Sequence, residues 1–64
     1  MKWTYDRDAD AAYLKLSDAK IVESEEARQG IVFDFDKHGK IVGIEISPAS
    51  KRLYTKDLVP VAAE

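Results

Sequence analysis

The chain has 64 residues, a formal net charge of −2 at pH 7 and no cysteine. This length allows one domain, the lack of cysteine excludes disulfides and thiolate zinc sites, and the mild acidity argues against the basic surface that nucleic-acid binding requires. No apolar run approaches the roughly 20 residues of a membrane helix, and no apolar signal segment stands at the N-terminus. We therefore expect one domain over residues 1–64, in the cytoplasm, that binds neither nucleic acid nor membrane.

The first third of the chain predicts three strands. Trp3 and Tyr5 alternate with polar residues, and residues 11–17 alternate again, so that the two segments form a hairpin. The aspartate-rich segment between them favours a turn, because aspartate side chains bond nearby backbone groups. Residues 21–27 predict an exposed third strand with charges that block aggregation, although propensity alone also allows a helix over residues 21–29.

Residues 30–47 predict a second hairpin, with the turn Lys37-His38-Gly39-Lys40 between two alternating segments. A three-residue loop would leave Glu45 on the apolar side, so we predict a loop with an even number of residues. The predicted pairs are Phe35 with Val42, Phe33 with Ile44, and Ile31 with Ile46.

The end of the chain predicts a short helix over residues 49–54, with Ser47 as its cap and Pro48 in its first turn. Residues 55–64 are expected to form a tail, with one short strand near Leu58. The predicted fold class is α+β, mainly β: a small antiparallel sheet of four to five strands in hairpins, with a short C-terminal helix. The predicted core consists of Trp3, Tyr5, Leu14, Leu16, Ile31, Phe33, Phe35, Val42, Ile44 and Ile46.

Two acidic segments are candidates for cation binding. Asp34, Asp36, Gly39 and Glu45 nearly match the spacing of an EF-hand calcium loop. Such a loop lies between helices, whereas these flanks alternate with a period of two, so we interpret Asp34 and Glu45 as diagonal neighbours on the polar side of a hairpin. A cation-binding domain or weak metal-dependent enzyme stays open as the alternative function. Its residues would be Asp6, Asp8, Asp10, Asp34 and Glu45.

Other signs of catalysis are missing from the sequence. His38, the single histidine, falls at a predicted hairpin tip, which offers neither a partner nor a pocket for a general base. No nucleophile triad, phosphate loop or dinucleotide motif stands out. We therefore predict no catalytic residue, no metal ligand, no cofactor and no enzyme activity.

A second apolar set, Tyr13, Val32 and Ile41, is predicted on the face opposite the core, and exposed apolar patches often mark interfaces. The short helix cannot cover a whole face of the sheet, and a core of this size gives only about 3–5 kcal/mol. A two-fold dimer would cover both faces with one self-complementary patch. We therefore predict a protein-interaction module that forms a homodimer, with Tyr13, Val32 and Ile41 at or near the interface.

The same elements carry a more specific pattern. It consists of Tyr5-Asp6, Asp10-Ala11-Ala12-Tyr13-Leu14, Asp34-Phe35-Asp36, Gly39 and Gly43-Ile44-Glu45-Ile46. In these residues the chain resembles a family of small prokaryotic proteins, domain of unknown function 2283, from about Lys2 to Ser50. The resemblance implies a compact β-rich fold without an established activity. Because some members are encoded beside small toxin-like proteins, it also implies an antitoxin-like role with a protein partner encoded nearby.

Overall fold

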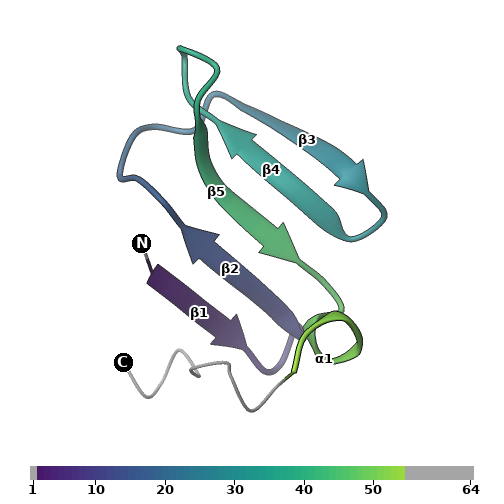
Figure 1. The fold of residues 1–64 in the computed structure, drawn as a ribbon. Coiled ribbons are helices and arrows are strands. Elements are labelled where there is room, and N and C mark those ends of the chain that lie inside the picture. The colour runs from purple at the N-terminus through teal and green to yellow at the C-terminus, as the bar shows by residue number, and fades with distance from the viewer. Residues whose placement is uncertain (1, 55–64) are drawn as a thin grey trace.

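The computed structural model of the chain describes residues 2–54, and it shows one antiparallel sheet with a single helical turn (Figure 1). The order of the strands across the sheet is β1-β2-β5-β4-β3. The predicted class, α+β and mainly β, is confirmed. The tail expected over residues 55–64, with its strand near Leu58, lies outside the described residues. The elements are β1 (Lys2–Asp6), β2 (Ala11–Lys15), β3 (Glu23–Arg28), β4 (Ile31–Phe35), β5 (Ile41–Ile46) and α1 (Ala49–Arg52).

The first hairpin forms as predicted, and an aspartate builds its turn. Asp6 Oδ1 accepts hydrogen bonds from the backbone amides of Asp8, at 3.0 Å, and Ala9, at 3.3 Å. Asp10 then takes a positive φ of 50°, a conformation that aspartate tolerates better than most residues. The turn thus brings Tyr5 opposite Ala12.

The third predicted element is a strand and not a helix, which resolves the alternative left open by propensity. It forms the edge strand β3, and all six of its residues are exposed. It starts two residues later than predicted, although Val22 already donates a backbone hydrogen bond of 2.9 Å to Phe35. The acidic residues of β3 therefore line one border of the sheet.

The β4–β5 hairpin has the predicted register but not the predicted loop. Asp36 pairs with Lys40 by a 2.9 Å backbone bond, which leaves a three-residue loop that ends in Gly39 at a φ of 79°. A bulge on β5 then inserts Val42 as an extra residue, so that Phe35 pairs with Ile41 rather than with Val42. Beyond the bulge the pairs Phe33–Ile44 and Ile31–Ile46 are confirmed. The even-numbered loop was therefore wrong, because a bulge restores the register that the odd loop would have shifted.

The helix is shorter than predicted and starts differently. Pro48 occupies the N-cap position with ψ at 126°, which is extended backbone, and no side chain caps the helix from that position. Ser47 does not act as the cap, since its backbone amide donates to the Gly30 carbonyl at 2.8 Å. The first amides of α1 bind Asp10 instead: Ala49 donates to its carbonyl and Ser50 to its carboxylate. A residue from the first hairpin thus holds the helix at the start of β2.

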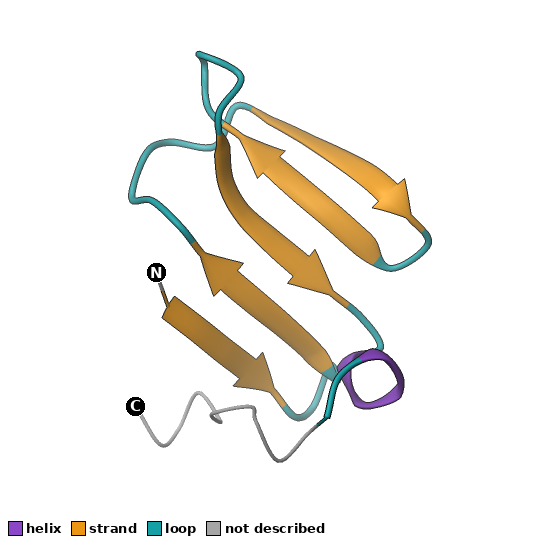
Figure 2. Cartoon of the chain, viewed as in Figure 1, coloured by secondary structure: helices purple, strands orange, loops and turns teal. Residues whose placement is uncertain are grey.

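The sheet forms a single layer, with α1 beside one end of it (Figure 2). The strand pairing gathers eight of the ten predicted core residues on one side, which we call the apolar face; the side that carries Tyr13, Val32 and Asp34 is the polar face. The other two, Leu16 and Val42, have no paired residue, since Leu16 follows the end of β2 and Val42 is the bulge residue. Of the predicted core only Val42 is buried, with 3% of its surface exposed, and none of the large side chains in residues 2–54 is fully buried. The pattern therefore identified the correct face, but the described part of the chain does not enclose it.

Candidate interaction surface

The structure divides the three residues predicted at an interface. Tyr13 and Val32 both lie opposite Glu45, from β2 and β4, and residues that pair across antiparallel strands share a face. Ile41 pairs with Phe35 instead, because the bulge at Val42 changes its position relative to the rest of β5. Tyr13 and Val32 therefore belong to the polar face, while Ile41, 40% exposed, lies beside Phe35 on the apolar face.

The polar face carries a hydrogen-bonded group that spans three strands. The Tyr13 hydroxyl on β2 donates to Asp34 Oδ2 on β4 at 3.0 Å, and the Ser24 hydroxyl on β3 donates to Asp34 Oδ1 at 2.6 Å. Partial burial, together with the bond to Asp34, raises the pKa of Tyr13. Tyr13 reaches Asp34 across β5 at Gly43, where a Cβ would overlap its hydroxyl. The group therefore connects β2 of the first hairpin to β3 and β4, and both carboxylate oxygens of Asp34 accept a hydrogen bond.

A second tyrosine–aspartate pair fastens the helix. Asp10 Oδ1 accepts from the Tyr5 hydroxyl at 2.8 Å and from the Ser50 amide at 3.0 Å, while Oδ2 accepts from the Ser50 hydroxyl at 2.6 Å. The bonds from Ser50 and Tyr5 lower the pKa of Asp10, and the bond to Asp10 raises the pKa of Tyr5. The sequence analysis interpreted Asp10 as a turn residue. It did not predict the contact with Ser50, because the two residues are 40 positions apart in the chain and no local sequence pattern connects them.

The acidic residues of the metal alternative are not assembled into one site. Residues 2–54 contain no group of three or more histidine and acidic side chains placed to hold a metal ion. Asp6 accepts amides of its own turn, Asp10 binds Ser50, and Asp34 binds Tyr13 and Ser24. Asp34 and Glu45 are diagonal neighbours on the polar face, as predicted.

The hairpin tip that resembled a calcium loop is closed by a carboxylate. Asp36 Oδ1 accepts the backbone amides of His38, at 2.8 Å, and Lys40, at 2.9 Å. The bond from the Lys40 amide is the main cause that lowers the pKa of Asp36. His38 itself is exposed at the tip. Asp36, one of the residues that match the EF-hand spacing, thus serves as the hydrogen-bond acceptor of this turn.

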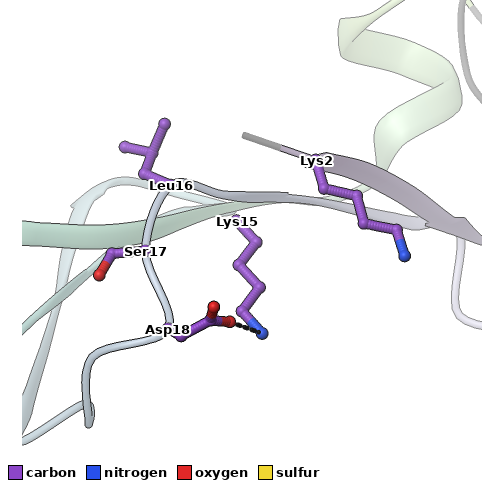
Figure 3. A pocket seen from close by; sticks show the side chains of 5 residues that line it. All are labelled: Lys2, Lys15, Leu16, Ser17 and Asp18. Carbon is purple, nitrogen blue, oxygen red and sulfur yellow. Dashed lines mark ion pairs between the residues drawn. The ribbon is translucent and has the colours of Figure 1, made fainter.

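A shallow hollow lies at the end of the first hairpin, lined by Lys2, Lys15, Leu16, Ser17 and Asp18 (Figure 3). Lys15 Nζ and Asp18 Oδ1 form an ion pair of 2.7 Å, which lowers the pKa of Asp18 and neutralises this lysine. Asp18 therefore balances the positive charge of Lys15 inside the hollow. Figure 3 also shows Leu16 pointing to the opposite side of the strand from Lys2 and Lys15, toward the apolar face.

The apolar face is only partly covered by the described residues. Trp3 and Leu16 are 36% and 39% exposed, and Phe33 packs edge-to-face on Phe35 with ring centroids 6.5 Å apart. On the β3 border, Glu23 and Glu25 lie opposite Phe35 and Phe33. The sequence analysis predicted a helix too short to cover the sheet and an interface with Tyr13, Val32 and Ile41 on the opposite face; of these three residues, Ile41 lies beside Phe35 on the apolar face.

Comparison with known proteins adds a family to this description. The sequence profile of the family described as "Protein of unknown function (DUF2283)" matches residues 2–50. Searches of the curated proteins and of the solved structures found no match. The matched span includes all five strands, both tyrosine–aspartate pairs and the start of α1. The chain therefore belongs to the DUF2283 family.

Proposed function

We propose that this chain is a protein-interaction module that binds another protein chain through its apolar face. The observation that supports this role is the partial exposure of that face: large side chains from four neighbouring strands share it, and of the predicted core residues only Val42 is buried by the described residues. Monomeric proteins rarely expose a contiguous apolar surface of this kind, and such surfaces mark interaction sites.

The border of the face adds specificity to the proposal. Glu23 and Glu25 lie directly beside the two phenylalanines, whereas the opposite border carries the aromatic residues Trp3 and Tyr5. The face thus has an apolar centre with a charged rim on its β3 border, a feature that polar interface rims share. The charged rim would orient a partner, while the apolar centre would supply most of the binding free energy.

In its more specific form, the proposal makes the chain an antitoxin-like protein of the cytoplasm that binds a small toxin-like partner encoded nearby. Support for this form comes from the family resemblance. Co-expression with the products of the adjacent genes, followed by affinity purification, tests it. A stoichiometric complex with one adjacent product is expected, and purification of the chain without any of them would disprove the antitoxin-like form.

The contribution of the apolar face is tested with a matched pair of variants on one strand. Trp3→Lys places a charge on the apolar face, and Thr4→Lys places the same charge on the polar face of β1. We expect the Trp3 variant to lose the complex and the Thr4 variant to keep it, since burying an unpaired charge in an apolar interface is costly. Equal retention of the complex by both variants would contradict the proposal.

We further propose that the chain is not an enzyme. The carboxylates of Asp6, Asp10 and Asp34 already accept hydrogen bonds that hold the turns, the helix and the sheet together. Calorimetric titration with Mg²⁺, Ca²⁺ and Mn²⁺ tests the metal-dependent alternative. We expect no binding heat at millimolar metal; saturable binding that Asp6→Asn abolishes would contradict this expectation.

A further inference from the structure

We propose that the occupant of the apolar face is the same face of a second copy of the chain, in a two-fold dimer whose axis runs along β5. This inference rests on the general form of the proposed function, that the apolar face binds another chain, and it names a second copy, in place of a toxin-like partner, as the chain that covers this face. Each copy would supply the second layer that the other lacks. The two sheets would then stack face to face as a sandwich, about 10 Å apart.

The burial pattern supports a partner that is present from the moment of folding. In residues 2–54 the buried residues are Ala12, Val42, Gly43 and Ala49, of which only Val42 has a sizeable side chain. A sheet with so small an enclosed core gains little stability alone. A second copy is available whenever the chain itself is made, and obligate homodimers often have no stable folded monomer.

The dimensions of the chain are adequate for this dimer. The two longest extents of the described part are 34 and 26 Å, and its shortest is 17 Å, so residues 2–54 form a slab with a broad side. A stable interface of standard size buries about 800 Å² on each partner. The broad side of the slab can provide such an area, whereas the sheet edges cannot.

The charges on the apolar face select between two ways of stacking aligned sheets. Because β5 is the central strand and β3 an edge strand, an axis along β5 sets β3 of one copy over β1 of the other. Glu23 and Glu25 then face the partner's border strand and not their own counterparts. An axis perpendicular to the strands would stack β3 on β3 and bring four glutamates together, which is unfavourable.

In this arrangement the side chains near the axis meet their own copies, as in any isologous interface. Ile44 lies at the middle of β5, opposite Leu14 on one side and Phe33 on the other. It would form the centre of the interface, and Trp3 would lie near its border. Because Trp3 is the single tryptophan, its fluorescence reports on the covering of the apolar face.

Sedimentation of the full chain over a range of concentrations tests the dimer, with Trp3 emission and iodide quenching recorded on the same samples. We expect a dimer that dissociates on dilution, with a red shift of Trp3 emission and greater quenching in the dissociated chain, and circular dichroism on the same samples shows whether that chain stays folded. Leu16→Lys should weaken association by about tenfold or more, because Leu16 lies on the apolar face and a lysine there would be desolvated. Ala19→Lys adds the same charge in an exposed loop and should leave association unchanged.

The contrary outcomes are distinct. A folded monomer at high concentration with Trp3 open to iodide would disprove the second copy but leave the proposed function standing, since the face would remain open to other chains. A folded monomer with Trp3 shielded would disprove both, because the chain itself would then cover the face. If the Leu16→Lys variant forms the dimer equally well, and Trp3 emission does not change when the dimer dissociates, the dimer uses another surface. That result would overturn this inference.

Discussion

Tyr13 extends from β2 across Gly43 on the neighbouring strand, and a Cβ added to Gly43 would overlap the tyrosine hydroxyl. The close approach allows the hydroxyl to reach Asp34 on the far side of β5. A glycine inside a strand weakens it unless another group needs the space, and here a tyrosine side chain occupies that space. The two residues therefore act as one structural unit on the polar face.

The first prediction follows from this contact. Gly43→Ala should lower the free energy of unfolding by about 1–3 kcal/mol, because either Tyr13 or the strand must move. Urea denaturation at one fixed protein concentration measures the loss. The same substitution in a Tyr13→Ala background should cost clearly less, since the overlapping side chain is gone. An equal loss in both backgrounds would show that Tyr13 is not the reason why position 43 requires a glycine.

The second prediction concerns the hydrogen bond at the end of this contact. Tyr13→Phe removes the donor to Asp34 and keeps the ring, so it should destabilise the fold by about 0.5–1.5 kcal/mol, near the lower end because the pair is partly exposed. Thermal unfolding measures the change. Tyr54→Phe is the control, since Tyr54 is 80% exposed. Similar melting temperatures for the two variants would contradict a stabilising role for the Tyr13 hydroxyl.

The third prediction concerns the attachment of the helix. Asp10→Ala removes the acceptor for Ser50 and Tyr5, so it should lower the melting temperature and increase amide exchange in residues 49–52. Asp8→Ala is the control in the same turn, where the backbone of Asp8, and not its carboxylate, bonds to Asp6. Equal effects of the two variants would show that the turn alone matters.

The fourth prediction is a dependence of stability on acid pH. Hydrogen bonds hold the pKa values of Asp10 and Asp36 below those of the unfolded chain. The unfolded state therefore takes up protons first, so this stabilisation is complete above about pH 4 and is lost as the pH falls through the folded pKa values. Melting temperatures recorded from neutral to acid pH measure it. Asp10→Asn should flatten the profile; an unchanged acid profile would contradict the assignment.

The alkaline side should show the opposite sign for tyrosine. The pKa values of Tyr5 and Tyr13 are raised in the folded chain, so their contribution is present below about pH 10 and is lost as the pH rises further. Tyr5→Phe and Tyr13→Phe should each reduce the alkaline loss of stability in thermal unfolding. If both variants lose stability with alkaline pH as steeply as the natural chain, the two hydroxyls are not responsible.

Alternation along the chain was sufficient to predict the strands of the two apolar hairpins, the apolar face and the pairs Phe33–Ile44 and Ile31–Ile46, because an apolar set on one face fixes a register. The sequence pattern did not predict the residue that caps the helix. Ser47 has the right residue type in the right place, but the acceptor that binds the first amides of α1 comes from Asp10, in a distant turn. Local capping rules cannot detect a partner supplied by tertiary structure.

The residues predicted at an interface show a second limit of sequence patterns. Tyr13 and Val32 were assigned to a contact surface because they are apolar residues on the face opposite the core, yet Tyr13 is engaged by Asp34. The pattern states which side chains share a face but not what covers them. The open side of the sheet therefore became visible only when the burial of Phe33 and its neighbours was known.

The bulge at Val42 separates the register next to the loop from the register of the rest of the hairpin. Next to the three-residue loop Phe35 pairs with Ile41, and one extra residue on β5 then brings Asp34 opposite Gly43 and Phe33 opposite Ile44. Deleting Val42 alone would remove the bulge and keep every one of these pairs, so that the β4–β5 hairpin would be regular with the same loop. When related sequences are aligned, a one-residue gap at this position of the strand should consequently need no matching gap in the turn.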